Sequence, residues 1–88
     1  MITAKLIDNI WATRKAASLQ GYKLMLAEVI GGTQVGRRMV VVDTIGAGIG
    51  ERVIVTTGSS ARRMLENDQV PVDAVVVGII DEDCRFEE

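Results

Sequence analysis

Histidine is absent from this 88-residue sequence, and cysteine and proline occur once each, as Cys84 and Pro71. A single cysteine permits no internal disulfide. Without imidazole, one thiol cannot complete an ordinary zinc, haem or transition-metal ligand set. The missing histidine also removes the usual general base for a serine or cysteine nucleophile. We therefore expect no metal, no cofactor and no catalytic residues.

Aromatic residues and excess charge are also scarce. Phe, Trp and Tyr make up 3% of the chain, and the net charge is −2. Such a charge gives no general attraction to nucleic acid or to anionic membranes. No apolar run approaches the ~20 residues of a membrane span, and the first residues lead directly into a strand-like pattern without a signal peptide. We predict a cytoplasmic protein that binds neither nucleic acid nor membrane.

The length predicts one domain, residues 1–88, with a short acidic tail at 82–88. A domain of this size buries only about 60% of the surface that its unfolded chain exposes. Small domains commonly gain stability from disulfides, metals or oligomerisation. Since the composition argues against the first two, oligomerisation is the remaining source of stability.

Five segments have the apolar, β-branched composition of strands, and one segment favours a helix. The predicted strands are 2–12, 22–30, 39–45, 52–57 and 74–80, and the predicted helix starts at Gly58-Ser59-Ser60 and ends near residue 66. A change in the apolar parity of the first strand predicts a bulge near residues 7–9. This order predicts a mainly β protein: a small five-stranded OB-like barrel with one short helix between strands four and five.

Several predicted strands are apolar on both faces. In 74–80 the side chains of Val75, Val76, Val77 and Ile79 show no polar alternation, whereas a strand with one solvated face should alternate. One short helix cannot cover several outer faces of a barrel. We therefore predict an obligate oligomer, whose subunits cover each other's apolar surfaces.

A glycine-rich stretch at 43–51 joins the third and fourth strands. The dinucleotide fingerprint G-x-G-x-x-G would need glycine where Glu51 stands, and a helix where 52–57 is strand-like. No Lys-Ser or Lys-Thr pair follows the glycines, so a P-loop is excluded too. We interpret the stretch as a subunit-contact loop whose ends are fixed by hydrogen bonds to its two acids. The predicted contact residues are Asp43, Gly46, Ala47, Gly48, Gly50 and Glu51.

Two further motifs have structural interpretations. Ser59 or Ser60 can accept hydrogen bonds from the first turn of the helix, and Arg62 beside that turn could hold an anion. Asp73 precedes the last strand, where it could cap a turn or pair with Arg62. The aromatic residues Trp11, Tyr22 and Phe86 are assigned to core or interface packing.

Three of these motifs occur in an order that resembles the vertex-protein family of bacterial microcompartments, of the ethanolamine-utilisation and carboxysome type. They are the stretch 43–51, the sequence GSSAR at 58–62, and 71–73 leading into 77–81. The resemblance implies a non-catalytic barrel that forms a homopentamer at the vertices of a polyhedral shell. The implied partners are the hexameric shell proteins of the facets and the encapsulated enzymes.

An alternative from another class is an OB-type binding module for single-stranded nucleic acid or an oligosaccharide. The strand count motivates this interpretation. The acidic charge and the scarcity of stacking aromatics oppose it.

Overall fold

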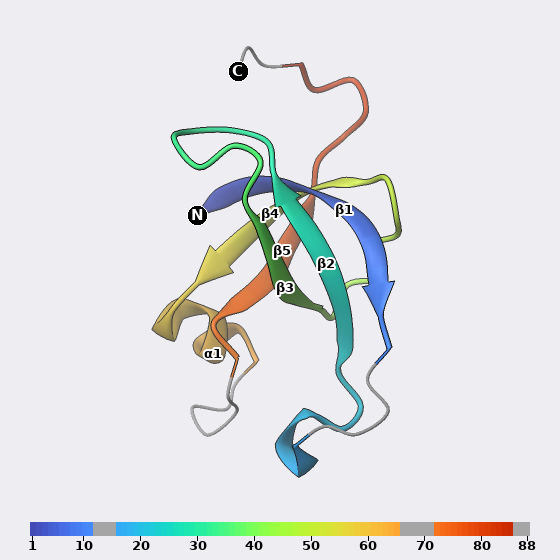
Figure 1. The fold of residues 1–88 in the computed structure, drawn as a ribbon, viewed down its shortest axis with the longest axis vertical. Helices are drawn as coiled ribbons and strands as arrows, with labels where there is room; N and C mark the ends of the chain where they lie inside the picture. Colours follow the sequence, from blue (N-terminus) through green and yellow to red (C-terminus); the bar gives the residue numbers. More distant parts are fainter. Residues whose placement is uncertain (12–15, 66–71, 86–88) are drawn as a thin grey trace.

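The computed structural model describes residues 1–11, 16–65 and 72–85 (Figure 1). Within these ranges the chain forms five strands, one 3₁₀ turn and one α-helix. They are β1 (Ile2–Ile10), η1 (Ala17–Leu19), β2 (Lys23–Val29), β3 (Arg38–Asp43), β4 (Arg52–Thr57), α1 (Ser59–Met64) and β5 (Ala74–Ile79). No helix among the described residues is long and apolar enough to cross a membrane.

The strands close into a barrel in the order β1-β2-β3-β5-β4, and β4 pairs back onto β1. The pairs are antiparallel except β3–β5, which is parallel and consists of Val42 opposite Val75 and Asp43 opposite Val76. Helix α1 lies below the barrel in Figure 1, between β4 and β5 in the chain. The predicted mainly β, five-stranded barrel with one short helix is confirmed.

Two of the described ladders contain a register shift. In β1 the shift falls between Leu6 and Asp8, which confirms the bulge predicted from the change of parity. In β5 the partner of Val55 is Val76 while the partner of Ile54 is Gly78, so Val77 is the extra residue. The second bulge was not predicted. A bulge is recognised in a sequence by a break in the alternation of apolar and polar residues, and β5 has no such alternation.

The barrel interior is filled by small and medium apolar side chains. Its buried members are Ala4, Leu6, Met25, Ala27, Val41, Ala47, Val53, Val55, Ala74 and Val76. They come from all five strands and from the glycine stretch, which supplies Ala47. With so few aromatics available, the core depends on close packing of β-branched and small residues.

A second buried cluster lies outside the barrel wall. Val42 and Val75 pack there with Ala61 and Val72, and the partly buried side chains around them include Leu65 and Tyr22. The outer face at Val75 is therefore covered by α1 of the same chain. The burial of both faces of β5 at Val75 thus needs no second subunit. This corrects, for Val75, the prediction that another subunit covers the outer side of the apolar strands.

Several predicted boundaries differ from the structure. The third strand ends at Asp43 and not at residue 45, because the Asp43 carboxylate accepts a hydrogen bond from the Ile45 amide (3.1 Å) and turns the chain. The first strand ends at Ile10, and its predicted end at residue 12 lies outside the described residues. The predicted loop after it contains the 3₁₀ turn η1.

The predicted serine cap is wrong. Gly58, with φ 68°, is the N-cap of α1, and no side chain makes the capping hydrogen bond. Ser59 and Ser60 are instead the first helical residues, and both are exposed. Glycine stands at the cap because the backbone there has a positive φ, which other residues adopt only with strain.

Candidate assembly site

The glycine loop, residues 44–51, is fixed at both ends by the two flanking acids. The Asp43 carboxylate accepts from the Ile45 amide, and the Glu51 carboxylate accepts from the Gly48 amide at 2.7 Å. The Glu51 amide donates in return to the Gly48 carbonyl (3.2 Å). The predicted role of Asp43 and Glu51 in shaping this loop is thus visible in the hydrogen bonds.

Lys23 adds an anchor that the sequence did not reveal. Its ammonium donates to the Ala47 carbonyl at 2.7 Å and lies 3.3 Å from Oδ2 of Asp43. The Asp43 side chain is fully buried, and its Oδ2 has no hydrogen-bond partner. The ion pair with Lys23 therefore offsets the cost of burying this negative charge. Lys23 and Asp43 are cross-strand partners on β2 and β3. Only the strand register could have indicated the pair.

The loop is also attached to the barrel by its middle. Ala47 is completely buried in the barrel core. The Gly50 amide donates to the Leu6 carbonyl (2.7 Å), and the Leu6 amide donates to the Glu51 carbonyl (3.0 Å). Ala47 therefore acts as a core residue and not as a surface contact, which corrects its predicted assignment. Ile45 and Ile49 are large apolar side chains of the loop that project, 42% and 56% exposed.

These contacts also bear on whether the glycine loop could bind the phosphate of a nucleotide, the function of the G-x-G-x-x-G and P-loop motifs considered above. A cradle needs backbone N–H groups that point at a bound anion. In this loop the N–H groups of Ile45, Gly48, Gly50 and Glu51 all donate within the chain. The loop is built to hold its own shape.

The three glycines of the loop are not equivalent, and this predicts different effects of substitution. Gly46 has φ 86° and a Cβ added to it would meet open space, whereas Gly48 has no positive φ and a Cβ there would lie 3.5 Å from Glu51 Oε1. We expect Gly46→Ala to destabilise the fold by about 1 kcal/mol, through backbone strain alone. Gly48→Ala should be nearly neutral.

Thermal unfolding at one protein concentration checks this pair. A loss of about 1 kcal/mol corresponds to a melting temperature about 4–8 °C lower for a domain of this size. Equal melting temperatures for Gly46→Ala and Gly48→Ala would contradict the assignment of strain to Gly46.

A second apolar surface lies on the outer wall of two strands. Leu26 of β2 pairs with Val40 of β3, and both face outward because Met25 and Val41 beside them are buried in the core. Val40 is 50% exposed. At one end of this surface the Arg38 guanidinium lies 3.3 Å from the Glu28 carboxylate. We call it the β2–β3 outer face, made of Leu24, Leu26, Glu28, Arg38 and Val40.

Residues 1–81 match the family model described as "Ethanolamine utilisation protein EutN/carboxysome". The chain belongs to the EutN/CcmL family. It is 45% identical over 83 residues to the bacterial microcompartment shell vertex protein GrpN of Rhodospirillum rubrum, covering 92% of this chain and 93% of the relative. It is 39% identical over 84 residues to the shell vertex protein EutN of Escherichia coli, covering 93% and 88%.

Solved structures of pentameric microcompartment shell proteins have the same fold. The pentameric microcompartment shell protein GrpN from Rhodospirillum rubrum matches with a TM-score of 0.79 at 43% identity, over 92% of this chain and 95% of that one. A pentameric shell protein from the RMM microcompartment matches with a TM-score of 0.85 at 31% identity, over 100% and 99%. The resemblance stated from the motifs is therefore confirmed.

The helix motif of this EutN/CcmL chain has a structural role that differs from the predicted one. Arg62 donates to the Val72 carbonyl at 3.5 Å, and the Gly58 amide donates to the Asp73 carbonyl at 2.8 Å. Arg62 and Asp73 both lie within the described residues, and the predicted ion pair between them is not formed. Both contacts instead hold the start of β5 against α1.

The remaining predicted residues divide between core and surface. Val75 and Val76 are fully buried, Val77 is partly buried and Ile79 is 41% exposed. Tyr22 packs against the outer cluster, as expected for an aromatic in the core. Trp11 is 87% exposed, so it is not a core residue of the single chain. Phe86 lies outside the described residues.

Proposed function

We propose that this chain is a structural shell protein that forms homopentamers and caps the vertices of a polyhedral bacterial microcompartment. The observation that carries the proposal is the match to a solved pentameric relative at 43% identity over 92% of the chain. The relatives' description as shell vertex proteins supports the same role. A vertex protein with a purely structural role needs no catalytic residues, which is in keeping with a sequence that lacks histidine.

A cyclic ring needs two different surfaces on each subunit, because head-to-tail contacts join unlike patches. The chain offers two exposed apolar surfaces. One is the β2–β3 outer face around Val40, and the other is the glycine loop with Ile45 and Ile49. We propose that these surfaces take part in the ring contact, and that the backbone of a neighbouring subunit approaches at Gly46, Gly48 and Gly50 near the five-fold axis.

The proposed partners follow from the geometry of a closed shell. A flat hexagonal layer cannot close on itself, and five-fold units supply the curvature that it lacks. The pentamer would therefore contact hexameric shell proteins at its rim, within a shell in the cytoplasm that encloses enzymes. In this role the chain needs no cofactor and has no enzymatic activity.

Native mass spectrometry of the purified protein tests the proposal. We expect five copies for the wild type. Gly48→Val should abolish the pentamer while leaving a folded barrel by circular dichroism, because the added branched side chain stands where the neighbour approaches. Gly48→Ala is the matched control, with a single added methyl group.

A stable wild-type monomer would overturn the vertex proposal. A pentamer of Gly48→Val with the wild-type dissociation concentration would mean that the glycine loop faces solvent in the ring. That second result would leave the pentamer itself in place and remove only the loop from its contacts.

A further inference from the structure

The acidic charge of this chain is concentrated after the last strand. Residues 1–80 contain nine basic and seven acidic side chains, a net charge of +2, while residues 81–88 contain one basic and five acidic side chains, a net charge of −4. The family model matches residues 1–81, so nearly all of this segment lies beyond the family match. We call residues 81–85, the described part, the C-terminal arm.

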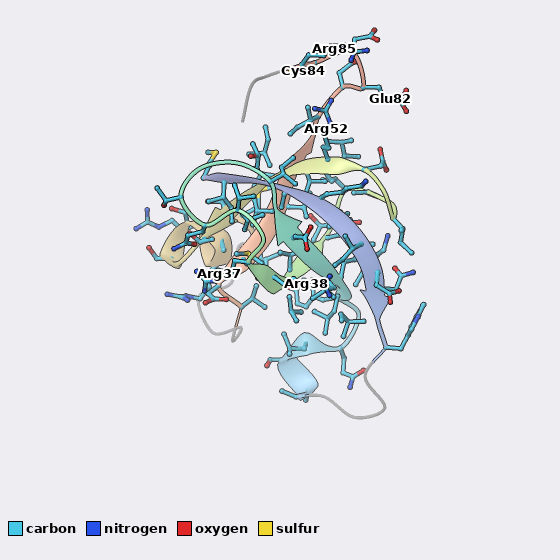
Figure 2. The ribbon with its side chains drawn as sticks, turned by 45° about the horizontal axis from the view of Figure 1, so that its top comes forward. Arg37, Arg38, Arg52, Glu82, Cys84 and Arg85 are labelled. Carbon is cyan, nitrogen blue, oxygen red and sulfur yellow. The ribbon has the colours of Figure 1, made fainter. Side chains whose placement is uncertain are left out.

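Arg52, the first residue of β4, holds the arm against the end of the barrel. Its Nη2 donates to the carbonyls of Asp81 (2.9 Å), Glu82 (3.5 Å) and Cys84 (2.6 Å). The arm is also turned on itself, since the Asp83 amide donates to the Asp81 carboxylate at 2.8 Å. Figure 2 shows Arg52 at the base of the arm, with Glu82, Cys84 and Arg85 above it. In these contacts Arg52 binds carbonyl oxygens, so it positions the arm through the arm's backbone.

A hollow of about 400 Å³ separates the arm from the barrel. It is lined by Glu51, Ile79, Ile80, Asp81, Glu82 and Asp83. Ile79 is 41% exposed there, so the hollow combines apolar surface with an acidic rim. A long basic side chain suits such a site, because its aliphatic stem packs on apolar groups while its charged head meets carboxylates.

The chain itself carries a matching basic group. Arg37 and Arg38 lie where the β2–β3 turn enters β3, and both are exposed. Arg37 donates to Gln34 (2.9 Å), and Arg38 retains 62% side-chain exposure beside Glu28. Figure 1 shows the β2–β3 turn and the arm leaving the barrel at the same, upper end. In the single chain the two arginines lie well away from the labelled arm residues (Figure 2).

We propose that the acidic hollow of the C-terminal arm receives Arg37 and Arg38 of a neighbouring copy of this chain. The inference rests on the proposed ring, which places one flank of a subunit beside the opposite flank of the next. Charge complementarity selects a second copy as the occupant. Residues 81–88 have a net charge of −4 and residues 1–80 a net charge of +2, so each copy supplies both an acidic and a basic surface. The arm would add an electrostatic contact to the apolar ones.

Charge reversal tests this contact. The loop variant carries Arg37→Glu and Arg38→Glu, the arm variant carries Glu82→Arg and Asp83→Arg, and a combined variant carries all four changes. Arg63→Glu, at an exposed arginine of α1, is the control for a change of net charge. Dissociation of the ring on dilution is followed by native mass spectrometry and light scattering, at low and high salt.

At low salt we expect the loop and arm variants to dissociate at roughly tenfold higher concentration than the wild type, as for a small set of exposed ion pairs. The combined variant should recover most of this loss, and high salt should shrink every difference. Arg63→Glu should behave as the wild type.

Unchanged dissociation of both reversed variants would overturn the inference, and so would a combined variant weaker than either parent. In both cases the rings themselves would persist, so the proposed function would stand. A wild-type protein that forms no pentamer would overturn the proposed function and this contact together. Arm variants that form normal rings but no longer bind purified facet subunits would instead assign the hollow to a different partner and reject the second copy.

Discussion

Val76→Asp is expected to leave the barrel unfolded. Val76 is completely buried on the inner wall of β5, within the cluster that contains Leu6 and Val55. A carboxylate at this site would lie among apolar side chains, and an unpaired buried charge costs several kcal/mol. Domains of ordinary size have only about 5–15 kcal/mol of stability in total, and one of 88 residues belongs near the lower end.

Far-ultraviolet circular dichroism and thermal melting measure this effect. Val76→Ala is the matched control, because it removes volume without adding charge and should lower stability by roughly 1–3 kcal/mol. Val77→Asp is a second comparison. As the extra residue of a bulge, Val77 is only partly buried, and the substitution should be milder. A folded Val76→Asp protein with the wild-type melting temperature would contradict the described core.

Val40→Asp is expected to dissociate the ring while the barrel stays folded. Val40 is half exposed in the single chain, at the centre of the β2–β3 outer face. A carboxylate there remains in contact with water in the monomer, so it costs the fold little. If the ring covers this face, the same carboxylate becomes a buried charge at each of the subunit contacts, where the cost is several kcal/mol.

Sedimentation velocity separates the two effects, since it reports the size of the assembly while circular dichroism reports the fold. Val40→Thr is the control, because it has nearly the same shape and no charge. A pentamer of Val40→Asp as stable as the wild type would show that the β2–β3 outer face points to solvent in the ring. The glycine loop would then remain as the candidate apolar contact.

The sequence predicted the barrel well because its strands are separated by clear turn signals. The fourth strand, residues 52–57, was predicted with the observed bounds, and the bulge in β1 followed from a change of parity at Ile7. The third strand was predicted too long. Its predicted end at Ile45 counted an apolar side chain that follows the polar residues Asp43 and Thr44, and the side-chain hydrogen bond of Asp43 ends the ladder earlier.

The assembly site was harder to predict, because its parts meet only across the fold. The sequence indicated that Asp43 and Glu51 shape the loop, but Lys23 is twenty residues before Asp43 and meets it through the register of β2 and β3. Ala47 was assigned to a contact because its neighbours are glycines, yet its methyl group faces the core. Arg52 was not singled out, since the arm contacts it makes are to backbone carbonyls, which leave no pattern in the sequence.

The alternative of an OB-type binding module gains no support from the described residues. Stacking of bases or sugars needs exposed aromatic rings on the barrel wall. The β2–β3 outer face carries leucine and valine instead, and Trp11 follows the end of β1 at the margin of the barrel. Aliphatic surfaces of this kind favour contact with another protein.

The short parallel pairing of β3 with β5 has a consequence for how the chain folds. Its two residue pairs join segments about thirty residues apart in sequence, and the four pairs of the β1–β4 ladder join segments about fifty residues apart, whereas the β1–β2 and β2–β3 ladders are longer and more local. Contacts between distant segments form late, because closing the long loop between them costs conformational entropy before the contact stabilises the fold. We expect both seams to close late in folding, and the β3–β5 seam, which has only two residue pairs, to open first in native-state hydrogen exchange. A newly made subunit is then a curled, incomplete sheet until α1 and β5 dock.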